Sequence, residues 1–534
     1  MVTLLAQPRA AVRAEHGVVA TSHPAAAEVG RDILRAGGTA VDAAIATAAV
    51  LTVVEPTSNG LGGDAFALVW DGMQLHGYNG SGRAPAALTP ETVRAAGHDS
   101  MPTYGWLSVT VPGQIRAWAD LHDRFGRLPW RRLLAPAARL AREGTPTPPV
   151  VAHYWQRAVA GGEQRAGRDY GGFLPTFAPA PKEGETRSLP GHARTLERLA
   201  AEGTDDFYRG GIASGIAQYA ADTGGLLTIE DLAAHKGEWV APITIGYGDR
   251  YALAEIPPNG QGIAALIALG ILRGLDVGDD LTADTSLHIQ IEAMRLAFAD
   301  VFAHVGDPTH VEVPTSGLLS EAYLEGRREL IGERAGEFPE GEPPRGGTVL
   351  LCAADEHGQQ ISLIQSNFHG CGSGVVVPEW GIALQNRASG FVLEQGHPNE
   401  LRPGRRPFHT IIPGFLLENG VPKGPFGVMG GHMQAQGHVQ VVLHTSLGAD
   451  PQQALDAPRW RVEPADTDEG YEVLLEPGLA DAADGLRGLG HPVRVVDDGG
   501  FGRGQAIWRV DPASGAGGWI AGSETRCDGL AAGY

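Results

Sequence analysis

The feature that most constrains the fold is a hairpin of two buried strands, predicted over residues 348–355 and 359–367. Apolar side chains stand at neighbouring positions in both strands, as in "VLLCAA" and "ISLI", and the short turn "EHG" joins them. A strand that is apolar on both faces needs cover on both sides of its sheet. The hairpin therefore predicts a layered α/β architecture.

Other segments supply the helices and strands that such layers need. Apolar spacing, capping residues and turn signals predict helices over 22–35, 129–142, 194–201, 281–305, 434–447 and 450–456, and one that begins after Thr39. Strands are predicted over 65–70 and 73–78, joined at Asp71-Gly72, and over 381–386, 411–417, 424–429, 505–510 and 517–522. We find no internal repeat and no low-complexity linker.

Length and charge restrict the class of protein. A chain of 534 residues suggests about three or four domains at roughly 150 residues each, although large single α/β domains are common exceptions. The formal net charge of −21 argues against nucleic acid and against an anionic membrane surface as partners. A small-molecule substrate is the remaining expectation.

The cysteines and the apolar runs indicate the compartment. The chain has 3 cysteines, Cys352, Cys371 and Cys527, too few for a disulfide framework, so a reducing compartment is expected. The start, "MVTLLAQPRAAVRAEHG", has no apolar segment of signal-peptide length. The longest apolar run, Ala43 to Val54, is shorter than the ~20 residues of a bilayer span and predicts a buried core helix. We expect a soluble, cytoplasmic protein.

Thr348 stands where a loop rich in proline and glycine gives way to the first strand of the hairpin. A threonine hydroxyl becomes an effective nucleophile when a base lies beside it, and the α-amino group of the same residue can be that base. The intrinsic pKa of an α-amino group is about 8, so part of it is neutral near pH 7. This chemistry requires cleavage of the peptide bond between Gly347 and Thr348.

Thr348 could make this cut itself, by attacking the carbonyl carbon of Gly347 and leaving an ester that water hydrolyses. Gly347 lacks a Cβ and tolerates the strained backbone that such an attack needs. Taken alone, a Gly-Thr pair is also ordinary at the start of a strand.

Two further motifs carry possible chemistry. In "GVMGGHMQ", Gly430 and Gly431 end a strand and open a helix, so their N–H groups are suited to hold an oxyanion, although a tight strand-to-helix turn is the simpler interpretation of this motif alone. Arg83 in "GSGRAP" can present a planar fork to a carboxylate, although a solvated arginine is the simpler interpretation of a single residue.

Several common site types are missing from the sequence. There is no HExxH motif and no Cys/His ligand spacing, so no metal site is predicted. There is no GxSxG elbow of a Ser-His-Asp hydrolase, and neither glycine-rich loop is followed by GK[ST]. No metal or organic cofactor is expected.

Long motifs occur in order along nearly the whole chain: "GGTAVDAAIATAAVLTVVEPTSNGLGGDAF", "PPNGQGIAALIALGIL", "GGTVLLCAADEHG", "GSGVVVP", "GRRPFHTIIPG", "GVMGGHMQ" and "DGLAAGY". Together they resemble the gamma-glutamyltranspeptidase family of N-terminal nucleophile hydrolases. The resemblance implies a four-layer αββα sandwich, made as one precursor that cleaves itself into a large subunit, residues 1–347, and a small subunit, residues 348–534.

The resemblance also assigns roles to residues. Thr348 matches the nucleophile of both self-cleavage and catalysis, Gly430 and Gly431 match the oxyanion pair, and Ser366 matches the hydroxyl residue that supports the nucleophile. For substrate binding, Arg83 matches the arginine that binds the α-carboxylate. His409 and Thr410 fall where relatives often have a serine pair on the same carboxylate, and Asn367 aligns with a binding asparagine after a shift of one residue.

One departure bears on the substrate. Transpeptidases of the family bind the substrate's α-ammonium group through an aspartate just before a phenylalanine, and here Gly390 stands at that position. A buried ammonium group needs an opposite charge to replace its lost water. The chain resembles the divergent, cytoplasmic branch of the family, whose neighbours include glutaryl-cephalosporin acylases and oxamate amidohydrolases.

The sequence therefore predicts a self-processing threonine amidase or acyltransferase of the gamma-glutamyltransferase or glutathione hydrolase type, acting on a carboxylate-bearing amide. An alternative is hydrolysis of a small acyl amide of the glutaryl or oxamate type. A second alternative is an unprocessed homologue that only binds carboxylate ligands.

Overall fold

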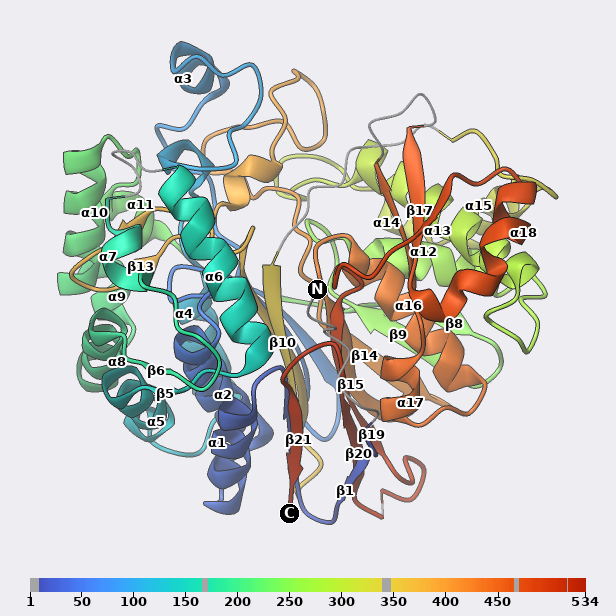
Figure 1. The fold of residues 1–534 in the computed structure, drawn as a ribbon, viewed down its shortest axis with the longest axis horizontal. Helices are drawn as coiled ribbons and strands as arrows, with labels where there is room; N and C mark the ends of the chain where they lie inside the picture. Colours follow the sequence, from blue (N-terminus) through green and yellow to red (C-terminus); the bar gives the residue numbers. More distant parts are fainter. Residues whose placement is uncertain (1–8, 166–170, 339–346, 465–469, 516) are drawn as a thin grey trace.

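The computed structural model describes residues 9–165, 171–338, 347–464, 470–515 and 517–534. Two antiparallel seven-stranded sheets face each other at the centre of the molecule, with helices on the outer face of each (Figure 1). We name them the β10 sheet and the β15 sheet.

The β10 sheet has the order β21 (Leu530–Gly533), β2 (Val18–Thr21), β10 (Gly347–Ala354), β11 (Gln360–Phe368), β3 (Asp64–Trp70), β4 (Leu75–Asn79) and β7 (Glu238–Val240). The β15 sheet has the order β1 (Val12–Ala14), β20 (Trp519–Ser523), β19 (Arg503–Arg509), β15 (Val421–Met429), β14 (Gly414–Glu418), β9 (Tyr251–Glu255) and β8 (Ile243–Tyr247).

Helices close the two outer faces. The β10 sheet is covered by α1 (Pro24–Arg35), α2 (Ala40–Val54), α4 (Gln114–Phe125), α5 (Trp130–Glu143) and α8 (Pro190–Glu202), drawn blue to green in Figure 1. The β15 sheet is covered by α12 (Gly262–Leu272), α13 (Asp284–His304), α16 (Met433–Ser446) and α17 (Pro451–Asp456).

The remaining elements surround these layers. They are α3 (Pro90–Ala95), α6 (Pro149–Gln164), α7 (Phe173–Phe177), α9 (Asp205–Arg209), α10 (Gly211–Thr223), α11 (Ile229–Ala234), α14 (Thr315–Leu318), α15 (Glu321–Arg328), α18 (Ala483–Gly488), the 3₁₀ turns η1 (Trp106–Ser108), η3 (Arg387–Gly390) and η4 (Pro477–Ala482), and the short strands β5 (Thr145–Pro146), β6 (Thr186–Arg187), β12 (Val376–Val377), β13 (Ile382–Ala383), β16 (Trp460–Pro464), β17 (Tyr471–Leu475) and β18 (Val493–Val495).

Strand β10 shows why its sequence is apolar at neighbouring positions. Val349 and Leu351 belong to the core between the β10 sheet and its helices. Leu350 and Cys352 point the other way, into the apolar layer between the two sheets. Both faces of β10 are therefore buried, which confirms the predicted αββα sandwich.

Helix α2 is buried along its whole length, as the apolar run Ala43 to Val54 predicts. A capping box starts it: Thr39 Oγ1 accepts a hydrogen bond from the Asp42 N–H at 3.1 Å, and the Asp42 carboxylate accepts one from the Thr39 N–H at 3.0 Å. Across the described ranges, no helix combines the length and the apolar character needed to cross a membrane.

Most predicted elements are present with shifted ends. The helices predicted over 22–35, 129–142 and 281–305 are α1, α5 and α13, and the hairpin at Asp71-Gly72 is β3–β4. The strand predicted over 381–386 is wrong beyond Ala383, since β13 has only 2 residues. The Gln385 side chain there accepts a hydrogen bond from the Arg387 N–H, and this contact turns the chain into η3.

Candidate active site

Thr348 lies at the beginning of β10, where the sheet register is irregular. Gly347 pairs with Phe368 and Val349 pairs with Gln365, so a bulge in β11 faces Thr348. The Thr348 hydroxyl donates to Ser366 Oγ at 3.2 Å and accepts from Gln434 Nε2 at 3.5 Å. Thr348 is only 1% exposed in this uncleaved chain.

Ser366 connects Thr348 to a residue with an unusual backbone. Its Oγ accepts a hydrogen bond from the Phe368 N–H at 2.8 Å, and Phe368 has a φ of +78°, which a residue other than glycine rarely adopts. The Ser366 hydroxyl therefore contacts both the Thr348 hydroxyl and the turn that ends β11. Ser366 thus contacts Thr348 directly, and its role in supporting a nucleophile remains a prediction.

Gly430 and Gly431 form the turn between β15 and α16. Their φ angles are +133° and +62°, which favour glycine, and a Cβ on Gly430 would lie 3.2 Å from the Gly502 Cα. Among the described residues, neither N–H finds a hydrogen-bond acceptor. Gln434, which contacts Thr348, lies in the first turn of α16, so the positive end of this helix meets the beginning of β10.

The Gln261 side chain forms hydrogen bonds to this turn and to the Thr410 carbonyl. Its Nε2 donates to the Thr410 carbonyl at 2.6 Å and to the Gly431 carbonyl at 2.9 Å, and its Oε1 contacts His432 Nδ1 at 2.7 Å. Burial lowers the pKa of His432 to about 3, so the imidazole is neutral near pH 7. Sequence reasoning missed Gln261 and Gln434: both lie in the motifs quoted above, but a glutamine side chain alone indicates no particular chemistry.

Arg83, the predicted carboxylate ligand, already has partners in this structure. Its Nη1 donates to Asp307 Oδ2 at 3.2 Å and to the Gly404 carbonyl at 3.0 Å. Its Nη2 lies 3.6 Å from Glu238 Oε1. A substrate carboxylate at Arg83 would have to compete with these two acids.

His409 and Thr410 are both buried, but their side chains have different partners. His409 Nε2 lies 3.2 Å from Asp64 Oδ2, and burial lowers the pKa of His409 well below its ordinary value. Burial also raises the pKa of Asp64 to about 7. Thr410 Oγ1 instead accepts a hydrogen bond from Arg387 Nη1 at 2.9 Å.

Asn367 lies against the glycine-rich loop that leads into β3. A Cβ on Gly60 would be 2.8 Å from Asn367 Nδ2, and one on Gly63 would be 2.9 Å from its Oδ1. Within the described ranges the Asn367 amide has no hydrogen-bond partner, and no contact joins it to Thr348. Its part in substrate binding remains a prediction.

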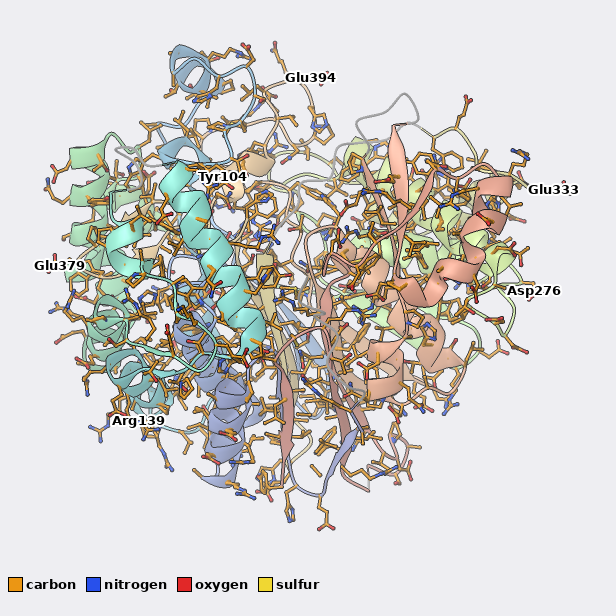
Figure 2. All side chains as sticks on the ribbon, viewed as in Figure 1. Tyr104, Arg139, Asp276, Glu333, Glu379 and Glu394 are labelled. Atoms are coloured by element: carbon orange, nitrogen blue, oxygen red, sulfur yellow. The ribbon has the colours of Figure 1, made fainter. Side chains whose placement is uncertain are left out.

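A cavity of about 590 Å³ opens beside Gly430 and His432, between α6 and β16. Its wall holds four arginines, Arg157, Arg165, Arg461 and Arg503, together with two acids, Glu463 and Asp498, which both pair with Arg461. Arg165 stacks on Tyr104 at 4.2 Å, and Figure 2 shows Tyr104 beside one end of α6.

Thr348 at the start of a buried strand and the helix-opening turn of Gly430 and Gly431 both adjoin the start of α16, inside an αββα sandwich, which is the fold of the N-terminal nucleophile hydrolases. The model of the family described as gamma-glutamyltranspeptidase matches residues 26–534, and the chain belongs to this family.

Known proteins agree with this assignment. The chain is 34% identical over 521 residues to the glutathione hydrolase-like YwrD proenzyme of Bacillus subtilis, which covers 93% of this chain and 98% of that protein. It is 35% identical over 534 residues to the oxamate amidohydrolase proenzyme of Klebsiella pneumoniae, and the match covers 97% of this chain and 98% of that protein. The crystal structure of cephalosporin acylase from Bacillus halodurans matches with a TM-score of 0.94 and 49% identity, over 99% of this chain and 98% of that one. The family and the fold identify the chain as an amidohydrolase.

Proposed function

We propose that the chain cleaves itself before Thr348 and then hydrolyses an amide whose acyl group carries a carboxylate. The observation that carries this proposal is the setting of Thr348: Ser366 and Gln434 hold its hydroxyl beside the helix-opening turn that contains Gly430 and Gly431. The products of self-cleavage are a large subunit, residues 1–347, and a small subunit, residues 348–534. Three relatives named as proenzymes support processing of this kind.

Self-cleavage begins when Thr348 Oγ attacks the carbonyl carbon of Gly347. The C–N bond breaks, the Thr348 nitrogen takes a proton, and the two parts are then joined by an ester. The Thr348 amine is free from this point, and water then hydrolyses the ester to give the Gly347 carboxylate and the Thr348 hydroxyl. The new amine is the base that the nucleophile requires.

In the mature enzyme, Thr348 Oγ attacks the substrate carbonyl while the Thr348 amine takes the hydroxyl proton. The N–H groups of Gly430 and Gly431 hold the oxyanion, and the leaving amine receives the proton as the C–N bond breaks. Water then hydrolyses the acyl-enzyme. An amino acid amine in place of this water would give transfer.

Two acyl donors fit this mechanism, a gamma-glutamyl group and a glutaryl or oxamate-type group. They differ in the α-ammonium group, and Gly390 offers no charge to pair with it. We therefore propose an acyl group without an ammonium. Glutaryl-p-nitroanilide and gamma-glutamyl-p-nitroanilide differ only in this group, and we expect the glutaryl compound to have the higher kcat/KM.

The first test is intact mass and N-terminal sequencing of the purified protein. We expect fragments of about 36 and about 20 kDa, the 56.0 kDa chain divided at residue 347 of 534, with the smaller fragment beginning Thr-Val-Leu-Leu. Thr348→Ala should stay intact and Thr348→Ser should be cut. A wild-type chain that remains whole would overturn the proposal and favour a protein that only binds carboxylates.

A further inference from the structure

Arg387 is a buried arginine whose hydrogen-bonding capacity is largely unused. It lies in η3, is 0% exposed, and its guanidinium lies 4.0 Å from the centre of the Phe368 ring. Nη1 donates to Thr410 Oγ1, but Nε and Nη2 have no acceptor among the described residues. These two nitrogens form one side of the guanidinium, the side that binds a carboxylate with two parallel hydrogen bonds.

Other buried arginines of this chain have an acceptor for their charge. Arg406 pairs with Glu238 at 2.6 Å, and Arg459 pairs with Glu524 at 3.0 Å. Arg405 donates to the carbonyls of Glu400 and Pro398. Burying an arginine without an anion is unfavourable, so an anion from outside the chain would stabilise Arg387.

Asp64 is the acid whose charge acts on Arg387, but its oxygens are already engaged. Oδ1 accepts hydrogen bonds from the N–H groups of Gly82 and Gly113, and Oδ2 contacts His409 Nε2. No ion pair within 4.0 Å joins Asp64 to Arg387 in the described residues. Burial accordingly lowers the pKa of Arg387 to about 9, against a weaker opposing effect of Asp64.

Short contacts connect Arg387 to the nucleophile. The Phe368 ring stacks on Arg387, and the Phe368 N–H donates to Ser366, which accepts from Thr348. Phe368 also pairs with Gly347, the residue before the bond to be cut. Self-cleavage would separate this pairing partner of Phe368 from Thr348.

A second path of contacts leads from Arg387 to the turn that holds the oxyanion. Arg387 donates to the Thr410 hydroxyl, and Gln261 donates to the carbonyls of both Thr410 and Gly431. The guanidinium is thus linked to both sides of the reacting position. In Arg83, by contrast, the fork already contacts Asp307 and Glu238.

We propose that Nε and Nη2 of Arg387 bind the carboxylate of the substrate's acyl group, so that Arg387 selects acyl groups with a carboxylate and without an ammonium. This inference rests on the proposed function, because it takes Thr348 as the nucleophile.

The test compares two amides of equal chain length, glutaryl-p-nitroanilide and pentanoyl-p-nitroanilide, which differ in the terminal carboxylate. For the wild type we expect a higher kcat/KM with the glutaryl compound. Arg387→Gln should lower this preference about 10- to 100-fold, because a hydrogen bond to a charged group is lost. Arg387→Lys keeps the positive charge but lacks the planar guanidinium, and its preference for the glutaryl compound should lie between those of the wild type and Arg387→Gln. Arg405→Gln, the matched loss of a buried arginine, should leave the preference unchanged.

A second measurement does not depend on turnover. Glutarate should raise the Tm of the processed wild type and of Arg405→Gln, and it should not raise the Tm of processed Arg387→Gln or Arg387→Lys to the same extent. Processed Arg387→Gln that keeps the wild-type preference, or a wild type that self-cleaves and is not stabilised by glutarate, would overturn the inference while the proposed function stands. An uncut wild type would overturn the proposed function itself. If Arg387→Gln does not fold, the comparison of Arg387→Lys with the wild type decides.

Discussion

Replacing Ser366 with alanine would test whether the contacts around Thr348 prepare it for attack. Ser366 Oγ accepts from the Thr348 hydroxyl at 3.2 Å and from the Phe368 N–H at 2.8 Å. Both contacts are buried, so water does not replace them easily. The change removes one oxygen and leaves the chain otherwise the same.

The size of the effect follows from these contacts. Leaving the Phe368 N–H buried without an acceptor costs about 1–3 kcal/mol. The φ of +78° at Phe368 is itself unfavourable, so the turn loses support where its backbone most needs it. If this free energy is lost from the conformation in which Thr348 attacks Gly347, self-cleavage should slow about 5- to 150-fold, since 1.36 kcal/mol corresponds to a factor of ten in rate.

The assay follows the amount of intact 56.0 kDa chain with time after purification, on a denaturing gel and by mass spectrometry. Ser366→Thr keeps the hydroxyl and should be cut faster than Ser366→Ala. Thermal unfolding separates a loss of stability from a loss of cleavage rate. A lower Tm with normal cleavage would mean that Ser366 only stabilises the turn. Cleavage of Ser366→Ala at the wild-type rate would refute the reasoning.

Two further changes have defined outcomes. Gly430→Ala places a Cβ 3.2 Å from Gly502 Cα at a φ of +133° and should displace the N–H groups proposed to hold the oxyanion, so kcat should fall up to about 100-fold. The control is Gly448→Ala, at a φ of +96° with no neighbour within 4 Å, which should lower Tm without lowering kcat. Equal kcat values for the two variants would contradict the oxyanion role. Burial lowers the pKa of His192 to about 4, so the folded chain keeps this histidine neutral while the unfolded chain protonates it below about 6.5, and stability should fall by about 3 kcal/mol between pH 6.5 and 4. His192→Gln should reduce the corresponding loss of Tm, and an unchanged pH dependence would show that His192 does not contribute.

The sequence predicted the layers well because their cause is local. Apolar residues at neighbouring positions in β10 required cover on both faces, and the two sets of side chains do point into different cores. The capping box at Thr39 and the turn at Asp71-Gly72 likewise depend on residues close in the chain. Such patterns can be recognised without knowing the fold.

The contacts between the residues of the candidate site could not be predicted from the sequence in the same way. Gln434 and Ser366 approach Thr348 from positions 86 and 18 residues away, and the contact of Arg387 with Phe368 depends on how η3 packs against the end of β11. In the sequence, Arg387 is one arginine among many. Only its burial and its unused nitrogens distinguish it, and both are properties of the fold.

The proposed mechanism also implies that self-cleavage and substrate hydrolysis have different rates. Before the cut, the Thr348 nitrogen belongs to a peptide bond and cannot act as a base. In the part of the chain that the structure describes, the Thr348 hydroxyl bonds to Ser366 and Gln434, and no carboxylate or imidazole bonds to it. The first attack must therefore proceed with a weakly activated hydroxyl, whereas each later attack has the freed amine beside it. In the proposed mechanism the first reaction occurs once in each chain and the second repeatedly, so a slow cut is sufficient, and we expect the released amine to make substrate hydrolysis the faster reaction.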